Sequence, residues 1–165
     1  MNSKELSGYL KAIKQSVNDF DAPEQARPAV YAITPAAEQG NTRAQYMLGM
    51  YYYTYYCEEP WMERAAEADN LKAIKFLADY YRFICDDMDL EKCKPLGRKW
   101  LYRMIDVLKK KADKGMVSAA KALMNIYVYD RPDDMTEKEG REAALACYER
   151  LIEILRTKAE KGTAK

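Results

Sequence analysis

The side chains available for chemistry in this chain are lysine, tyrosine, carboxylate and cysteine, because its 165 residues include no histidine. Histidine is the commonest general base and metal ligand, and every Ser-His or Cys-His nucleophile arrangement needs one. The phosphate-binding loop motifs and the GxSxG motif are also missing. We therefore expect no catalytic activity and no cofactor. The alternative is an enzyme that uses lysine, tyrosine and carboxylates, with a buried Lys or Glu of shifted pKa in a deep pocket.

The residue types that bind metals are present but wrongly spaced. The acidic stretch from Asp86 to Glu91 lacks the glycine and the ligand periodicity of an EF-hand loop. Glu58 and Glu59 are adjacent, so their carboxylates point apart and do not form a glycosidase-type pair. In a reducing compartment the cysteines are most simply small hydrophobes in or near the core. No metal site is expected from them, because they form neither a CxxC pair nor a zinc-finger pattern: Cys57, Cys85, Cys93 and Cys147.

Composition indicates a globular protein without a general affinity for nucleic acid or membranes. Hydrophobic residues make up 48% of the chain, enough to bury a core within one domain or a short repeat array. With 27 basic and 26 acidic residues the net charge is +1, so any electrostatic preference must be local. The lysine run from Lys109 to Lys114 falls at a helix end, where the helix dipole favours cations. No stretch has the length and apolarity of a membrane span or a signal-peptide core, so a cytoplasmic protein is expected.

A short motif recurs along the chain and predicts helical repeats. The strings AAEQGN, AAEADN, KADKGM and KAEKGT begin at Ala36, Ala65, Lys111 and Lys158. Each of the first three is followed by alanine, leucine and tyrosine at i, i+4 and i+8, which places them on one stripe of a helix. We interpret this stripe as a packing seam between helices. Its members are Ala44, Leu48 and Tyr52, then Ala73, Leu77 and Tyr81, then Ala119, Leu123 and Tyr127.

The pattern and its punctuation predict an all-α chain. Gly40, Gly115 and Gly162 fall where a preceding helix must stop, and Asp69 in the equivalent place predicts a less decisive end or a turn assisted by Asn70. Pro28 and Pro35 should kink or fray the second helix. The longest loops, 86–94 and 130–139, are acidic. The expected helices are 3–19, 24–38, 42–56, 60–68, 71–84, 95–113, 117–128 and 138–160.

The segments AAEQGNTRAQYMLGMYY and WMERAAEADNLKAIKFLADYY resemble the Sel-one-like repeats (SLR), which are relatives of the tetratricopeptide repeats. The resemblance covers about residues 29–162 and implies a right-handed α-solenoid of about four helix-turn-helix repeats in a single domain, 1–165. Residues 1–28 would form a divergent N-terminal helix that caps the stack. Two departures from the family pattern are a short middle unit and lengthened last units. The family implies binding of another protein and generally no catalysis.

In the related tetratricopeptide repeats, first-helix residues that flank the seam line a concave groove. Carried onto this chain, that rule predicts a locally basic, tyrosine-bearing groove that suits a partner protein with an acidic surface or segment. An ordinary solvated face is the plainer interpretation. The predicted groove residues are Arg43, Tyr46, Met50, Tyr53, Lys72, Lys75, Asp79, Arg82, Ser118, Lys121, Asn125 and Tyr129.

Tyrosine is unusually frequent, with 14 residues, and five of them crowd the segment from Tyr51 to Tyr56. A helix in a two-layer solenoid cannot bury every side, and exposed tyrosines favour interfaces. We expect at least Tyr53 or Tyr56 to contact a partner or a second copy of the chain, so a homodimer through Tyr51–Tyr56 is one hypothesis. A small free-standing solenoid would also suit an immunity or inhibitor protein for a toxin or enzyme. A self-assembling structural unit is the remaining alternative.

Overall fold

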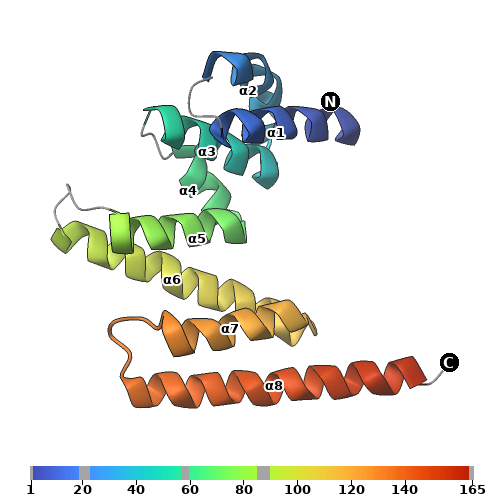
Figure 1. Cartoon of the computed structure of the whole chain (residues 1–165), viewed down its shortest axis with the longest axis vertical. Coiled ribbons are helices and arrows are strands. Elements are labelled where there is room, and N and C mark those ends of the chain that lie inside the picture. The colour runs from blue at the N-terminus through green and yellow to red at the C-terminus, as the bar shows by residue number, and fades with distance from the viewer. Residues whose placement is uncertain (1, 19–22, 57–59, 85–89, 164–165) are drawn as a thin grey trace. The chain divides into compact units, whose positions relative to one another are not determined.

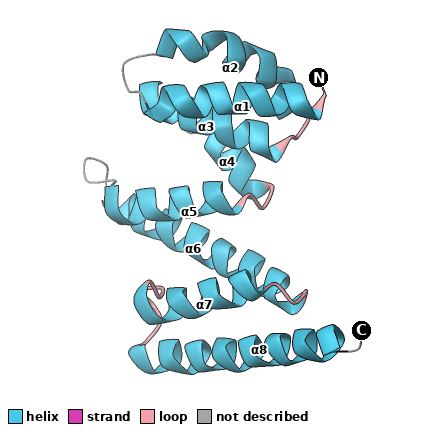
Figure 2. Cartoon of the chain, turned by 45° about the vertical axis from the view of Figure 1, so that its right-hand side comes forward, coloured by secondary structure: helices cyan, strands magenta, loops and turns pink. Residues whose placement is uncertain are grey.

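The computed structural model describes residues 2–18, 23–56, 60–84 and 90–163. Within these ranges every regular element is a helix and there is no strand, so the all-α prediction is confirmed (Figures 1 and 2). The chain divides into two compact units, Met1–Asp79 and Tyr80–Lys165. We call them unit 1 and unit 2 and describe each by itself. A single domain over 1–165 and a solenoid of four repeats stay predictions.

Unit 1 contains α1 (Ser3–Asn18), α2 (Pro23–Glu38), α3 (Thr42–Tyr56), α4 (Pro60–Glu67) and α5 (Leu71–Asp79). The helices α1, α2 and α3 pack on one another around a common apolar core. The helix α1 begins with a reciprocal cap, in which Asn2 Oδ1 accepts from the Glu5 backbone N–H at 2.9 Å and Glu5 Oε2 accepts from the Asn2 N–H at 3.0 Å. The largest side chains of this core are Leu10, Ile13, Val30, Ile33, Leu48 and Tyr51.

Unit 2 contains a π-helical turn, η1 (Tyr80–Ile84), and then α6 (Leu90–Asp113), α7 (Val117–Tyr129) and α8 (Glu137–Thr163). The helix α7 packs against both α6 and α8. Its apolar residues Leu123 and Ile126 share the buried interior with Leu101 and Ile105 of α6 and Leu151 of α8. The π turn interrupts the helix expected over 71–84, and α6 starts at Leu90, so residues 90–94 are helical and not loop as expected.

The predicted seam is buried at all its positions except Tyr52, which is half-buried. Leu48 and Leu77 have no exposed surface and Leu123 has 3%. Gly49, next to Leu48, shows how closely the helices approach, because a Cβ built on it would lie 2.8 Å from the backbone nitrogen of Met62 in α4. A side chain larger than glycine would therefore push α3 and α4 apart.

Three helices end in the same type of turn. In each, a residue with positive φ and the residue after it donate their N–H groups to carbonyls of the last helical turn. Gly40 and Gly115 have φ of +89° and +81°, as predicted. Asp69 adopts φ of +60° and the same bonds, with its N–H on the Ala66 carbonyl and the Asn70 N–H on the Ala65 carbonyl, both at 3.0 Å. Of the two expectations for this position, the less decisive end is wrong and the turn that involves Asn70 is found. Gly162 is also misassigned as a stop, because α8 continues to Thr163.

The prolines of α2 do not divide it. Pro28 and Pro35 both lie inside the single helix Pro23–Glu38, on its exposed side. Their missing N–H groups leave carbonyls that water can bond on that side. The helix is therefore continuous through both prolines, and a kink at either of them stays a prediction.

Candidate functional site

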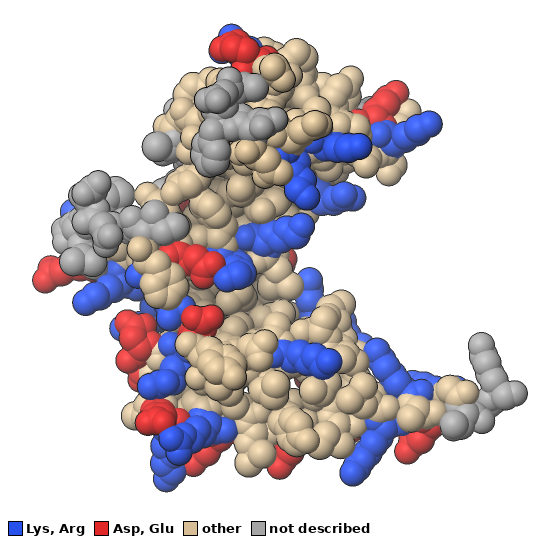
Figure 3. All heavy atoms as spheres, in the orientation of Figure 1, with Lys and Arg blue, Asp and Glu red and all other residues tan. Residues whose placement is uncertain are grey.

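Two of the three basic residues predicted on α3 and α5 lie at the starts of these helices. Arg43 and Lys72 are both exposed and each sits in the first turn of its helix. Asn70 joins the two starts, because its Nδ2 donates to the Thr42 carbonyl at 3.1 Å while its Oδ1 accepts from the Ala73 N–H at 3.3 Å. Figure 3 shows basic side chains gathered on one side of the α3–α5 region. The sequence thus places two cations at neighbouring helix N-termini.

The remaining predicted residues of unit 1 differ in how accessible they are. Tyr53 is half-buried, with its ring edge-to-face on Phe76 at 4.7 Å between centroids. Tyr46 is half-buried too, and this burial raises the pKa of its hydroxyl. Lys75 and Asp79 form an ion pair at 2.7 Å, which cancels one of the expected positive charges. Arg43 and Lys72 form no ion pair with another described residue.

The predicted residues of unit 2 lie on η1 and α7. Arg82 is half-buried, with its guanidinium 4.8 Å from the centre of the Phe83 ring and its Cγ against Gly97. Tyr129 is 81% exposed. Ser118, Lys121 and Asn125 are also exposed on α7. Since these residues and those of α3 and α5 belong to different units, one continuous groove through all of them stays a prediction.

In the tyrosine cluster of α3, Tyr51 belongs to the core, and half-buried Tyr52 and Tyr55 pack against that core. Tyr51 is 3% exposed and donates to the Pro23 carbonyl at 3.1 Å, and its burial raises its pKa to about 12. Tyr55 donates to the Ser16 carbonyl at 2.5 Å. These hydroxyls tie α3 to the end of α1 and the start of α2. Tyr56 is the exposed member of the cluster, and a homodimer through Tyr51–Tyr56 stays a prediction.

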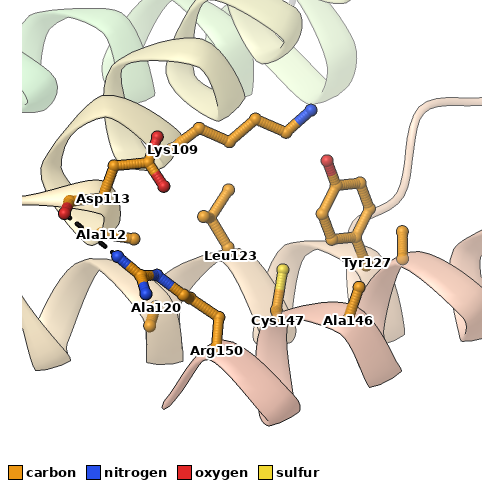
Figure 4. Close-up of a pocket in the computed structure, with 10 residues that line it drawn as sticks. Lys109, Ala112, Asp113, Ala120, Leu123, Tyr127, Ala146, Cys147 and Arg150 are labelled. Atoms are coloured by element: carbon orange, nitrogen blue, oxygen red, sulfur yellow. Dashed lines mark hydrogen bonds between the residues drawn. The ribbon is translucent and has the colours of Figure 1, made fainter. Parts of the chain in front are cut away.

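A cavity in unit 2 was not anticipated from the sequence. It has a volume of about 250 Å³ and lies between α6, α7 and α8 (Figure 4). Small side chains on the three helices leave the space: Ala112, Ala120, Ala143 and Ala146, with Leu123 as the floor. The alanines at facing positions of neighbouring helices are the sequence feature that could have predicted this cavity. The same feature equally predicts close helix packing, so it does not distinguish the two outcomes.

The polar groups of this cavity suit binding better than nucleophilic catalysis. Arg150 Nη2 donates to the Asp113 carbonyl at 3.1 Å, and its Nη1 pairs with Glu153 at 2.5 Å. Burial raises the pKa of the Cys147 thiol, against a smaller opposing effect of the Lys109 charge. The thiol therefore stays protonated at neutral pH, and a protonated thiol is a poor nucleophile.

A second hollow lies in unit 1, beside α2 and the turn that follows it. Its volume is about 620 Å³. No charged side chain lines it, so it offers little to recognise a specific ligand. Its lining is Leu6, Ala32, Pro35, Ala36, Gln39, Gly40 and Asn41.

The cysteines follow the sequence interpretation only in part. Cys147 is a free, half-buried thiol, as expected. Cys93 is buried, as expected, but it is disulfide-bonded and so is not a free thiol. Cys57, Cys85, Glu58, Glu59 and residues 86–89 of the acidic stretch lie outside the described residues. Within the described ranges no three His, Cys, Asp or Glu side chains are grouped as a metal site would require.

None of the helices within the described ranges combines the length and the apolarity that crossing a membrane requires. Comparison of the chain with protein-family models, with curated proteins and with solved structures finds no match.

Proposed function

We propose that this protein is a non-catalytic, SLR-type helical-repeat module that binds an acidic segment of a partner protein on the α3–α5 face. This face is defined by Arg43, Tyr46, Met50, Tyr53 and Lys72. The observation that carries the proposal is the pair of unneutralised cations, Arg43 and Lys72, at two helix starts joined by the Asn70–Thr42 hydrogen bond.

The electrostatics of these helix starts favour an anion. The N-terminus of a helix carries a partial positive charge, and the first turn is where acidic side chains usually offset it. Neither α3 nor α5 has an acidic residue in its first turn. The cations of Arg43 and Lys72 therefore add to the dipoles. A carboxylate-bearing segment would relieve this accumulation of positive charge and bind with strong salt dependence.

The half-buried aromatic residues of the same face would supply contact area. Tyr46 and Tyr53 each leave part of a ring exposed while the rest is packed, which limits the rotamer entropy lost on binding. Tyr53 is held by Phe76, so it is already positioned. Such a surface would suit a tight inhibitor complex, and an immunity-type role against a toxin or enzyme is the specific version of this proposal.

The test is capture of partners from native cell lysate by wild type and by the variant Arg43→Glu/Lys72→Glu. Arg82 is left unchanged because its side chain packs on Gly97 and reversal would disturb unit 2. The matched control is Lys11→Glu/Lys14→Glu, which reverses two exposed lysines on α1. We expect one protein, retained by wild type and control, to be lost by the α3–α5 variant and by raised salt. Equal retention by all three baits would contradict the proposal.

A second candidate function is self-assembly, and an apolar stripe on α8 favours it. Leu145, Tyr148 and Leu155 are 58%, 51% and 48% exposed, and with half-buried Ile152 they repeat at helical spacing. The stripe lies beside the face of α8 that packs on α7. Antiparallel pairing of two α8 helices would cover it and bring Glu139 at the start of one helix towards Arg156, Lys158 and Lys161 at the basic end of the other. Glu137 and Glu142 already pair with Arg141 and Lys138 of their own helix.

This candidate is tested by measuring mass against protein concentration. We expect wild type to dimerise and Leu145→Glu/Leu155→Glu to stay monomeric with unchanged helicity. Tyr56→Ser is the control for the tyrosine cluster and is expected to dimerise like wild type. A wild type that remains monomeric at every concentration would exclude self-assembly through α8.

A further inference from the structure

The cavity between α6, α7 and α8 has a polar group without a partner at its wall and an apolar interior. We propose that it is a binding site for a small apolar carboxylic acid, whose carboxylate is held by Lys109 and the Tyr127 hydroxyl and whose hydrocarbon body lies against Leu123. This site is separate from the proposed partner surface on α3 and α5.

Tyr127 supplies a hydroxyl donor at the cavity. Its side chain is a wall of the cavity and the residue is 5% exposed. Its hydroxyl makes no hydrogen bond with another described residue. Buried hydroxyls almost always have a partner, and in unit 1 Tyr51 and Tyr55 both reach backbone carbonyls. The Tyr127 hydroxyl oxygen is not among the buried polar atoms that lack a partner, so its acceptor is a water or a ligand at the cavity.

Lys109 supplies the positive charge. No ion pair joins it to another described residue. Figure 4 shows its side chain extended along the cavity, ending on the same side of the view as the Tyr127 hydroxyl. An ammonium and a hydroxyl can both donate to one carboxylate. The site therefore provides the donors that a carboxylate oxygen pair accepts.

The other charges at the cavity limit the ligand to one negative charge. Arg150 adds a second cation, but Glu153 pairs with it at 2.5 Å. The Asp113 carboxylate also borders the cavity. A ligand with two charges, such as a phosphate monoester, would meet too few unpaired cations and one unfavourable carboxylate. A monocarboxylate is the better match.

The interior sets the size and polarity of the rest of the ligand. Ala112, Ala120 and Leu123 are buried and apolar, and the Cys147 thiol, kept neutral because burial raises its pKa, completes an apolar wall. An engineered apolar cavity of roughly 150 Å³ holds benzene. A cavity of about 250 Å³ has room for a ring and a short chain. A compound such as 3-phenylpropionate has this size and charge.

The direct test is calorimetric titration of the full chain with 3-phenylpropionate and with its uncharged carboxamide. We expect saturable binding of the acid that is at least about tenfold tighter than binding of the amide, since a hydrogen bond to a charged group contributes about 1.5–3 kcal/mol. Tyr127→Phe and Lys109→Met are each expected to lower the affinity for the acid by about tenfold. Lys110→Met is the matched control, an exposed lysine outside the cavity, and is expected to bind like wild type.

Occupancy of the cavity is tested separately through Cys147. Alkylation of this thiol, located by peptide mass spectrometry, is expected to slow when 3-phenylpropionate is added. Ala146→Phe, which fills the cavity, is expected to abolish both binding and this protection while the helical circular dichroism is retained. Saturable binding that leaves Cys147 unprotected would place the ligand elsewhere and overturn the proposal, as would equal affinity for acid and amide.

A peptide ending in phenylalanine with a free carboxylate distinguishes the source of the ligand. If the free acid binds at least as tightly as this peptide, a small molecule is supported. If the peptide binds and the free acid does not, the pocket recognises a chain end and the small-acid proposal fails. Arg43→Glu/Lys72→Glu is expected to bind 3-phenylpropionate normally, so failure of the partner surface and failure of this site are separable.

Discussion

The helices α3 and α8 both carry more large apolar and aromatic side chains than one face can bury, and the two units treat them differently. In unit 1, α3 lies against α1, α2 and α4, so Tyr51 and Tyr55 find cover and hydrogen-bond acceptors. In unit 2, α8 packs chiefly on α7, and Leu145 and Tyr148 remain exposed. The number of neighbouring helices, rather than side-chain type, decides which aromatic residue becomes core.

The seam shows the same contrast in its packing density. Around Leu48 the approach of α3 and α4 leaves no room for a Cβ at Gly49. Around Leu123 the helices of unit 2 leave a cavity of about 250 Å³. One sequence pattern therefore gives a tightly packed seam in unit 1 and a hollow one in unit 2. This difference predicts unequal responses to equivalent substitutions.

The largest expected effect comes from truncating the seam leucines. Leu48→Ala is expected to lower the free energy of unfolding by about 2–5 kcal/mol, because a fully buried side chain leaves a new void. Leu123→Ala is expected near the lower end of that range, since Leu123 already borders a cavity and loses fewer contacts. Urea denaturation of both variants measures the difference. Equal losses would mean that the cavity does not loosen the packing of unit 2.

The glycines at close approaches sharpen the comparison. Gly49→Ala is expected to cost about 1–3 kcal/mol of stability because its methyl would meet the Met62 backbone. Gly97→Ala is expected to cost less, since the nearest atom is Cγ of the flexible Arg82 side chain at 2.7 Å. Gly8→Ala, with nothing within 4 Å, is the control and is expected to stabilise α1 by about 0.5–1 kcal/mol. A neutral Gly49→Ala would show that α3 and α4 can separate without penalty.

The buried hydroxyl of Tyr51 makes unit 1 sensitive to alkaline pH. Its pKa is about 12 in the folded protein against about 10 when unfolded, so the folded state keeps the proton longer. The free energy of unfolding is therefore expected to fall as pH rises from 10 towards 12. Tyr51→Phe is expected to cost about 1 kcal/mol at neutral pH and to flatten this decline.

Denaturation at pH 7 and at intervals above pH 10 checks the alkaline prediction, with Tyr148→Phe as the exposed counterpart in unit 2. That control is expected to change stability by a few tenths of a kcal/mol and to keep the wild-type pH dependence. An unchanged alkaline slope in Tyr51→Phe would assign the decline to other residues.

The smallest expected effect concerns the left-handed turns. Asp69→Gly is expected to raise stability by about 0.5 kcal/mol, because glycine adopts φ of +60° with less steric cost. Gly115→Ala, at the equivalent turn of unit 2, is expected to lower it by about 1 kcal/mol. Thermal melts of the two variants give the signs. A destabilised Asp69→Gly would indicate that the aspartate side chain contributes more than the strain it brings.

Local sequence signals predicted the helices well. The Ala-Leu-Tyr spacing located α3, α5 and α7, and glycine located the turns at Gly40 and Gly115, because both signals act within a few residues. The failures have local causes too. Gly162 did not end α8 because glycine is only permissive of a stop, and the expected loop 86–94 is helical from Leu90.

Side-chain neighbours could not be predicted in the same way. The charge of Lys75 is neutralised by Asp79 one turn away, whereas Arg43 and Lys72 keep theirs, and only the positions of surrounding groups distinguish these cases. The Asn70–Thr42 bond and the Tyr53–Phe76 contact join residues whose pairing depends on how α3 and α5 pack. The composition of the α3–α5 face was predictable, but its net charge was not.

By itself the sequence determined the all-α class, the approximate helix boundaries and the buried seam, because helical periodicity and glycine turns are short-range properties. Tertiary structure alone decided that Tyr51 is buried while the other tyrosines of α3 stay half-buried or exposed, that α8 keeps an apolar stripe outside, and that small residues of three helices border a cavity. These outcomes depend on the distance between helices, which a periodic pattern leaves open. An alanine facing another helix produces a close contact at one separation and a binding pocket at a slightly larger one.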